Sequence, residues 1–210
     1  MPKDIDPALL DVHARTQDIY DRAAQAFDQR RAKSLFERGW LDRLTSKLPA
    51  SPTVLDVGCG TGRPISSYLM ESGAVLTGFD FAPGMLAIAR ERYPRATWIE
   101  GDMRDIDLGQ TFGGVLSWDG FFHLSRAEQR DVLPRLAQHV RQSGCLMVTT
   151  GPADGEATGT VDGEAVYHAS LDPAEYMAIL SDCGFRHVEI VVEDPECDFH
   201  SIAFASQKAS

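Results

Sequence analysis

The fold of this chain is decided by the stretch Val54-Leu55-Asp56-Val57-Gly58-Cys59-Gly60-Thr61-Gly62-Arg63-Pro64. A short apolar run ends in a carboxylate, alternating glycines follow, and a helical pattern begins at Pro64, so the stretch predicts a buried strand, a tight loop and a helix. The glycines leave no Cβ inside the loop, which allows backbone N–H groups and the helix N-terminus to approach a ligand. Pro64 suits the first turn of a helix, where its missing N–H costs nothing.

Two common nucleotide-binding loops do not match this stretch. A phosphate-binding loop requires Gly-Lys-Ser/Thr at the helix start, and Gly62-Arg63-Pro64 offers neither the lysine nor the hydroxyl. A dinucleotide fingerprint requires G-x-G-x-x-G, whereas this loop reads G-x-G-x-G with Arg63 in the last position. A strand-to-helix turn that needs glycines only for its own shape stays open as an alternative.

The pattern apolar-Asp-apolar-Gly-x-Gly-x-Gly resembles the first motif of the class I S-adenosylmethionine-dependent methyltransferases, and here the match is complete. The resemblance extends from about residue 54 to the C-terminus. It implies an α/β fold: a Rossmann-like, doubly wound, mostly parallel seven-stranded sheet with an antiparallel last strand, helices on both faces and an N-terminal helical cap. It also implies S-adenosyl-L-methionine as cofactor and S-adenosyl-L-homocysteine as product.

Composition bounds the number of domains and the kinds of partner. At 210 residues with 43% hydrophobic content, one domain is expected. The net charge of −11, from 31 acidic and 20 basic residues, argues against nucleic acid or an anionic membrane as main partner, because such binding needs clustered positive charge. The N-terminus has no secretory pattern, and no run of eighteen apolar residues occurs, so we expect a cytoplasmic protein.

The cysteines do not have the spacing of metal ligands, so no metal site is expected. They are Cys59, Cys145, Cys183 and Cys197.

We predict four parts within one domain that spans residues 1–210. These are an N-terminal helical cap (1–50), a cofactor-binding half (53–150), a flap insertion (151–171), and a C-terminal helix with a strand pair (172–210). Within them the hydrophobic pattern predicts helices at Pro7–Arg38, Leu35–Leu48 and Ser125–Gln142, and a β-hairpin turning at Asp162-Gly163.

Two carboxylates follow successive predicted strands after the glycine loop. Asp80 ends the second strand, where a carboxylate can accept both hydroxyls of a ribose. A helix N-cap is the alternative role for Asp80. After the third strand, Asp102-Met103 matches the family position at which a carboxylate and the next backbone N–H bind adenine. Phe81 is a candidate to lie on the adenine face, and Tyr20 on the cap helix is a candidate at the same pocket.

The resemblance and these positions together give the predicted cofactor-binding set. It comprises Tyr20, Asp56, Gly58, Cys59, Gly60, Gly62, Asp80, Phe81, Met85, Asp102, Met103, Ser117, Trp118 and Phe121.

The segment after the fourth strand is unusually aromatic, reading Trp118-Asp119-Gly120-Phe121-Phe122-His123. In the family this segment faces the sulfonium methyl, and aromatic faces there exclude water and attract the positive sulfur. The Asn/Asp-Pro-Pro-aromatic tetrad of enzymes that methylate nucleic acid bases is absent. We name His123, His168 and Asp119 as catalytic candidates, with His123 first because imidazole titrates near neutrality.

The predicted hairpin lies at the carboxyl edge of the sheet, where open α/β folds bind ligands. We therefore expect Tyr167 and His168 on the hairpin, with Phe122 and His123, to bind the substrate. Alternatively, the hairpin covers the sheet edge or pairs with another subunit.

These observations predict methyl transfer to a small-molecule acceptor by in-line displacement in a desolvated, aromatic-lined site. Two alternatives stay open: a non-catalytic module that binds S-adenosylmethionine, or another enzyme on the same fold that uses NAD or transfers an aminopropyl group. The sequence does not indicate whether O, N, S or C is methylated, or whether the protein is a monomer or a homodimer.

Overall fold

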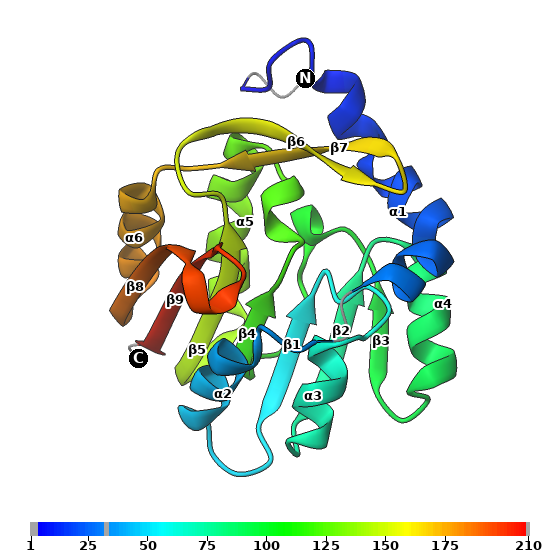
Figure 1. The fold of residues 1–210 in the computed structure, drawn as a ribbon. Coiled ribbons are helices and arrows are strands. Elements are labelled where there is room, and N and C mark those ends of the chain that lie inside the picture. Colours follow the sequence, from blue (N-terminus) through cyan, green and yellow to red (C-terminus); the bar gives the residue numbers. More distant parts are fainter. Residues whose placement is uncertain (1–3, 32–33, 209–210) are drawn as a thin grey trace.

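The computed structural model describes residues 4–31 and 34–208. Seven strands form one sheet in the order β3-β2-β1-β4-β5-β9-β8, and β6 and β7 form a separate hairpin above it (Figure 1). The strands are β1 (Thr53–Val57), β2 (Val75–Asp80), β3 (Thr97–Glu100), β4 (Phe112–Ser117), β5 (Val140–Thr150), β6 (Gly155–Val161), β7 (Glu164–Ser170), β8 (Phe185–Asp194) and β9 (His200–Lys208).

The sheet confirms the predicted topology. Strands β1 to β5 of the main sheet pair in parallel, and β9 inserts between β5 and β8 antiparallel to both. Since each parallel crossover returns the chain to the same edge, the carboxyl ends of β1, β2, β3 and β4 lie together. The loops that follow these strands are therefore neighbours, although they are far apart in the sequence.

Helices cover both faces of the sheet because its strands are apolar on both sides. Leu55 belongs to the hydrophobic cluster under α5 and α6, whereas its neighbour Val54 belongs to the cluster under α2, α3 and α4. The helices are α1 (Leu10–Arg30), α2 (Arg38–Ser46), α3 (Ile65–Glu71), α4 (Pro83–Arg92), α5 (Arg126–Gln138) and α6 (Pro173–Asp182), with short 3-10 turns η1 (Met103–Asp105), η2 (Phe121–His123) and η3 (Pro195–Cys197).

Helix α5 begins as its sequence predicts but ends earlier. The Ser125 hydroxyl accepts from the Glu128 backbone N–H while the Glu128 carboxylate accepts from the Ser125 N–H, forming a capping box. The prediction that the helix continues to Gln142 is wrong: it ends at Gln138, and β5 starts at Val140, which pairs with β4. Pairing with the sheet outweighs the weak helical preference of this segment.

Helix α1 runs across the carboxyl edge of the sheet beside the β6–β7 hairpin (Figure 1). It is shorter than the predicted Pro7–Arg38. The hairpin turn forms at Asp162-Gly163, where both residues have positive φ, as a two-residue turn of this composition requires. Ion pairs join the hairpin to α1, with Glu164 facing Arg15 and Arg22.

Polar contacts fix α1 over the glycine loop. Asp28 accepts two hydrogen bonds from the Arg92 guanidinium at 2.8 and 2.7 Å, and a third from the Thr61 hydroxyl at 2.6 Å. About two turns earlier on α1, the Asp21 carboxylate accepts from the Gly84 backbone N–H at 2.6 Å. Within residues 4–31 and 34–208, no helix combines the length and the apolarity needed to cross a bilayer.

Candidate functional site

A cavity with about 640 Å³ of empty space, counting its open mouth, lies between α1 and the carboxyl ends of β1, β2 and β4. Gly58, Gly60 and Gly62 have φ of +75°, +53° and +77°, a region that L side chains rarely adopt, so the loop around the cavity requires glycine. A Cβ on Gly60 would meet nothing within 4 Å, which means that this backbone is open for a ligand to approach.

The Asp80 carboxylate lies beside the glycine loop. One oxygen accepts from the Gly60 N–H at 2.8 Å, and the other accepts from the Ala82 N–H at 2.9 Å. Burial raises the pKa of Asp80 to about 6 in spite of these hydrogen bonds. A buried carboxylate with spare lone pairs gains from hydroxyl donors, and a ribose supplies two of them.

Asp56, at the end of β1, is the second buried carboxylate of the cavity. It accepts from the Ser66 hydroxyl at 2.6 Å. Burial raises its pKa to about 7, and the nearby charge of Asp80 adds to the shift. Asp56 therefore gives up its proton only near neutral pH.

A second cavity adjoins the first and shares Phe81, Met103, Gly120 and His123 with it. We call the two together the groove. Asp102 lies at its far end, where both carboxylate oxygens accept from the Arg104 guanidinium. Asp102, the predicted adenine-binding residue, is thus held in place by Arg104, two residues further along the chain.

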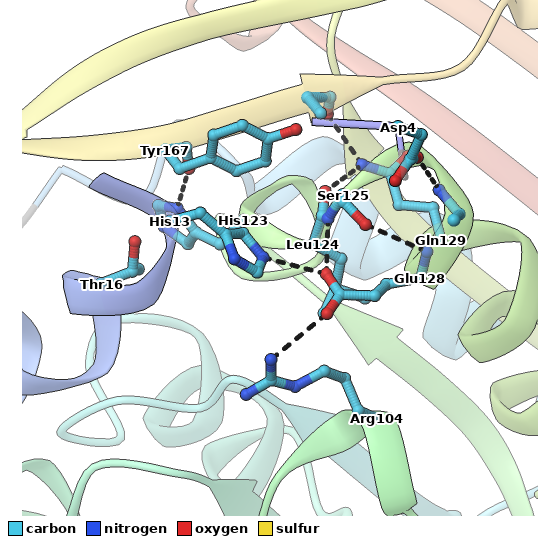
Figure 2. Close-up of polar contacts among 12 residues, drawn as sticks. Asp4, His13, Thr16, Arg104, His123, Leu124, Ser125, Glu128, Gln129 and Tyr167 are labelled. Atoms are coloured by element: carbon cyan, nitrogen blue, oxygen red, sulfur yellow. Dashed lines mark hydrogen bonds and ion pairs between the residues drawn. The ribbon is translucent and has the colours of Figure 1, made fainter. Parts of the chain in front are cut away.

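Arg104 also takes part in a wider network on this side of the groove. The Glu128 carboxylate accepts from Arg104 at 3.2 Å, from the Ser125 N–H at 2.7 Å and from the His13 ring at 3.0 Å (Figure 2). Burial raises the pKa of Glu128, but the hydrogen bonds from His13 and Ser125 outweigh it and lower this pKa to about 2. The network ties α1 to α5 across the second cavity.

His123 forms the wall between the groove and the hairpin. Its Nδ1 lies 2.8 Å from the Tyr167 backbone carbonyl, and its Nε2 lies 2.8 Å from the Tyr20 hydroxyl. A carbonyl only accepts, so Nδ1 carries the hydrogen and Nε2 accepts from the Tyr20 O–H. Burial lowers the pKa of His123 to about 4, with a further contribution from His168, and raises the pKa of Tyr20. Both groups are therefore neutral at pH 7.

Asp119 lines the first cavity, whereas Asp102 lines the second. One of its oxygens is 3.0 Å from the His200 Nε2, and the other is 3.3 Å from the Arg31 guanidinium. The sequence names Asp119 as a catalytic candidate, but its carboxylate already faces two cationic side chains. This arrangement suits binding better than proton abstraction.

Most of the predicted site residues line the groove. They are Tyr20, Asp56, Gly58, Cys59, Gly60, Asp80, Phe81, Met85, Asp102, Met103, Trp118, Asp119 and His123.

Three predicted cofactor residues lie outside the lining of the groove. Gly62 faces Trp98, whose ring would be 2.9 Å from a Cβ there. Ser117 is fully buried behind the glycine loop. Phe121 is core, with its ring 6.5 Å from that of Tyr176. A shift of one position along the chain moves a side chain from the cavity to the core, and the sequence pattern does not predict the position to that precision.

The predicted substrate residues are divided between the two faces of the hairpin. The Tyr167 side chain is fully buried and donates to Glu156 at 2.8 Å, so the expectation that its ring faces the substrate side is wrong. His168 points the other way, 4.7 Å from the Phe122 ring and 5.0 Å from the His123 ring. Since neighbouring residues of a strand face opposite sides, Tyr167 and His168 could not both face the site.

Several groove residues were absent from the predicted set: Phe27, Arg31, Thr61, Arg63, Gln17, His13 and Arg104. Three of them, His13, Gln17 and Phe27, lie on α1, and Arg31 follows its last residue. An amphipathic pattern shows which face of such a helix is buried but not which of its residues line a cavity. Phe27 and Arg31 follow Tyr20 at helical spacing, and this spacing is the signal that could have found them.

A glycine loop after β1, a buried carboxylate at the end of β2 and an acidic residue after β3, all along one groove, form the arrangement with which open α/β folds bind nucleoside-containing ligands. Residues 54–144 match the family described as methyltransferase domain. Over this segment the chain is similar to the class I S-adenosylmethionine-dependent methyltransferases.

Relatives of this chain include two curated methyltransferases. It is 39% identical over 102 residues to the dTDP-3-amino-3,6-dideoxy-alpha-D-glucopyranose N,N-dimethyltransferase of Streptomyces fradiae, covering 48% of this chain and 40% of that protein. It is 34% identical over 109 residues to the dTDP-3-amino-3,4,6-trideoxy-alpha-D-glucopyranose N,N-dimethyltransferase of Streptomyces venezuelae, covering 51% and 46%. The matches thus span less than half the length of these relatives.

Among solved structures, the chain resembles CalS10, an amino pentose methyltransferase from Micromonospora echinaspora. The TM-score is 0.69 at 22% identity, over 88% of this chain and 96% of that one. The likeness supports the fold described above.

Proposed function

We propose that this chain transfers a methyl group from S-adenosylmethionine to a small-molecule acceptor. The observation that carries the proposal is the continuous groove from Asp102, past Asp80, to the glycine loop. Its order of groups corresponds to base, ribose and amino-acid end. The fit is supported by the backbone itself, because the open space at Gly60 admits a ligand and a Cβ on Gly58 would already lie 3.4 Å from the Gly120 Cα.

Asp80 is the group that we expect to accept from both ribose hydroxyls. Its carboxylate is held by two backbone N–H groups and keeps further lone pairs. Asp102, oriented by Arg104, accepts from the exocyclic amine of adenine, and the Met103 N–H donates to a ring nitrogen. Phe81 lines both cavities and covers the nucleoside between them.

When bound, S-adenosylmethionine supplies a methyl group on a positively charged sulfur. The chain contributes alignment and exclusion of water. Tyr20 and His123 close the groove on the side of α1, and their mutual hydrogen bond fixes both side chains. With a pKa near 4, His123 is a weak base. Its main contribution is therefore to orient the nucleophile. It accepts a proton from a neighbouring donor only as the reaction proceeds.

Amino sugars are the acceptor class to test first. The two curated relatives carry names of N,N-dimethyltransferases that act on dTDP-linked amino sugars. In this chain both imidazoles on the hairpin side, His123 and His168, have lowered pKa values and are neutral at pH 7. A neutral wall favours an uncharged amine, which is the nucleophilic form.

Calorimetry with S-adenosylhomocysteine and NAD tests the cofactor. Binding of the former alone supports the proposal, whereas heat only with NAD, or with neither ligand, contradicts it. Turnover is then measured by mass spectrometry as the gain of a methyl group on a panel of amino sugars, other amines and phenols. Tight binding without any product would favour a non-catalytic binding module.

A further inference from the structure

A further cavity lies between the loop that follows β5 and the base of the β6–β7 hairpin. It has about 740 Å³ of empty space, counting its open mouth, and is lined by Phe122, residues 150–157 and residues 168–170. We call it the hairpin cavity. None of these residues lines the groove, so the hairpin cavity is separate from the place assigned to the cofactor.

Three aromatic rings stand between the hairpin cavity and the groove. The rings of Phe122, His123 and His168 contact one another in pairs, with centroids 4.7, 4.9 and 5.0 Å apart. Phe122 and His168 line the hairpin cavity, and His123 lines the groove. A molecule in the hairpin cavity is therefore separated from a ligand in the groove by one layer of side chains.

His168 differs from His123 in that no hydrogen bond holds its ring. His123 is fixed by the Tyr167 carbonyl and the Tyr20 hydroxyl, whereas neither ring nitrogen of His168 has a hydrogen-bond partner within residues 4–31 and 34–208. Burial lowers the pKa of His168, so the ring is neutral at pH 7 and offers one donor and one acceptor. Both nitrogens are therefore available to a ligand.

Gly159 on β6 provides the space for the His168 ring. A Cβ at Gly159 would lie 2.4 Å from the Cε1 of His168, and Gly159 is not among the glycines with positive φ. The absence of a side chain is thus required by the ring and not by the backbone. Glycine weakens the interior of a strand, and it commonly marks a close approach of another group.

Thr150 supplies a second polar group without a partner. It ends β5, lines the hairpin cavity and is 7% exposed. Its hydroxyl has no hydrogen-bond partner within the part of the chain that the structure describes. Buried hydroxyls are normally satisfied, so we expect a polar ligand group to bind here.

The charges around the hairpin cavity do not suit a phosphate group. The charged residues of its lining are Asp154 and Glu156, and the described lining contains no Arg or Lys. Arg126 pairs with both carboxylates, at 3.4 and 3.8 Å, and does not line the cavity. Since phosphates are bound mainly by such cations, and the chain has a net charge of −11, a phosphorylated ligand is repelled.

We infer that the hairpin cavity is the acceptor site and that it takes an amine without phosphate, whose polar groups bind to His168 and Thr150 while Phe122 packs against its apolar part. The inference rests on the proposed function. It gives this chain an acceptor different from the dTDP-linked sugars in the names of its curated relatives, because the described lining offers no cation to a diphosphate.

One amino sugar in three forms tests this specificity. D-glucosamine, D-glucosamine 1-phosphate and UDP-D-glucosamine carry the same amine and differ only in the charged group. With the protein saturated with S-adenosylhomocysteine, calorimetry should show D-glucosamine binding at least about 10-fold more tightly than the other two. The nitrogen NMR signals of the His168 ring, assigned with His168→Phe, should shift with D-glucosamine alone. With S-adenosylmethionine, mass spectrometry should detect the methyl group on D-glucosamine.

Thr150→Val removes the hydroxyl and keeps the shape of the side chain. The KM for D-glucosamine should rise about 3- to 10-fold while kcat stays within about 3-fold. Urea denaturation should show no loss of stability, because the hydroxyl has no partner to lose. Thr158→Val is the matched control: Thr158 is exposed and pairs with Tyr167, so it lies on the hairpin face opposite His168, and neither KM nor kcat should change.

Two variants address the His168 ring. His168→Phe keeps a ring beside Phe122 but removes both nitrogens, and Gly159→Ala displaces the imidazole without straining the backbone. Each should raise the KM for D-glucosamine about 3- to 10-fold and leave the affinity for S-adenosylhomocysteine within about 3-fold.

The outcomes distinguish this inference from the proposed function. If the protein does not bind S-adenosylhomocysteine, the proposed function itself fails. If it binds S-adenosylhomocysteine but D-glucosamine leaves the His168 signals unchanged, or the phosphorylated forms bind as tightly, the acceptor site is refuted. Equal effects of Thr150→Val and Thr158→Val also refute it. Selective binding of D-glucosamine, weakened by the Thr150 and His168 variants alone, supports the inference.

Discussion

The Nδ1–H of His123 donates to the backbone carbonyl of Tyr167 across 2.8 Å, joining the η2 turn to the hairpin (Figure 2). Because this bond uses backbone on the hairpin side, it does not depend on the Tyr167 side chain. It fixes one tautomer of His123 and directs the Nε2 lone pair to Tyr20.

The first prediction concerns His123. His123→Ala should leave the affinity for S-adenosylhomocysteine within about 3-fold and lower kcat by about 10- to 100-fold, since orienting contacts contribute about that much. Calorimetry and single-turnover kinetics measure the two effects separately. Tyr20→Phe, which removes the hydroxyl but keeps the ring, should reproduce part of the kinetic loss. Unchanged kcat in both variants would mean that the reacting atoms lie elsewhere.

The second prediction concerns Tyr167 itself. Tyr167→Phe should keep kcat within about 2-fold, because the carbonyl that holds His123 is retained. It should lower the free energy of unfolding by about 1 kcal/mol, for the lost hydrogen bond to Glu156. Urea denaturation and steady-state kinetics are the measurements. A large fall in kcat with unchanged stability would indicate that the Tyr167 hydroxyl contacts the substrate, contrary to this prediction.

The third prediction tests the ribose assignment. Asp80→Ala should weaken the binding of S-adenosylhomocysteine at least about 30-fold, since each hydrogen bond to a carboxylate contributes about 1.5–3 kcal/mol. Calorimetry on protein whose folding is verified by circular dichroism measures the change. Unaltered affinity would leave Asp80 with only its turn-forming role toward Ala82.

The fourth prediction follows from the raised pKa of Asp56, about 7 in the folded protein against an ordinary 3.8. The folded state holds a proton that the unfolded state has lost, so the contribution of this carboxyl to stability falls as the pH rises from about 4 through 7. Asn does not titrate. Asp56→Asn should therefore be more favourable to stability at pH 8 than at pH 5, by about 1–3 kcal/mol relative to the wild type.

Urea unfolding of both proteins at the two pH values measures this difference. His123 has the opposite sign: with a folded pKa of about 4, its contribution is lost as the pH falls below its ordinary 6.5. For this reason the stability of the variant is compared with that of the wild type at each pH, because the contribution of His123 is the same in both proteins and cancels in the difference. A difference that does not change with pH would show that Asp56 titrates normally.

The fifth prediction uses two glycines in helices. A Cβ on Gly84 would lie 2.7 Å from the Asp21 carbonyl oxygen, whereas a Cβ on Gly39 would meet nothing within 4 Å. Gly84→Ala should therefore push α1 away from α4. This should lower the free energy of unfolding by about 1–3 kcal/mol and weaken the binding of the cofactor. Gly39→Ala, in an exposed helical position, should raise stability by up to about 1 kcal/mol. Equal effects in the two variants would refute the close packing of α1.

The sequence predicted the order of strands in the main sheet and the positions of Asp80 and Asp102 at its carboxyl edge. Asp80 ends β2 and Asp102 follows β3, and parallel strands bring their carboxyl ends to one edge of the sheet. Local patterns also predicted the start of a helix at Ser125 and the hairpin turn at Asp162. These features depend on residues within a few positions of one another or on the order of strands.

The boundary of α5 and the orientation of Tyr167 were beyond the sequence pattern. Val140 enters β5 because β4 offers it a partner, and Tyr167 turns inward because the N-terminal segment covers that face of the hairpin. Both results depend on which distant element is adjacent. A local pattern carries no such information.

The sequence by itself therefore determined the fold, the glycine loop and the place of the groove, because strand order and turn chemistry are local or periodic properties of the chain. Only the tertiary structure decided the protonation state of His123 and the pairing of Arg31, Asp119 and His200. The charge and hydrogen bonding of these groups are set by neighbours that are distant in the sequence, and they act only after folding has excluded water from between them.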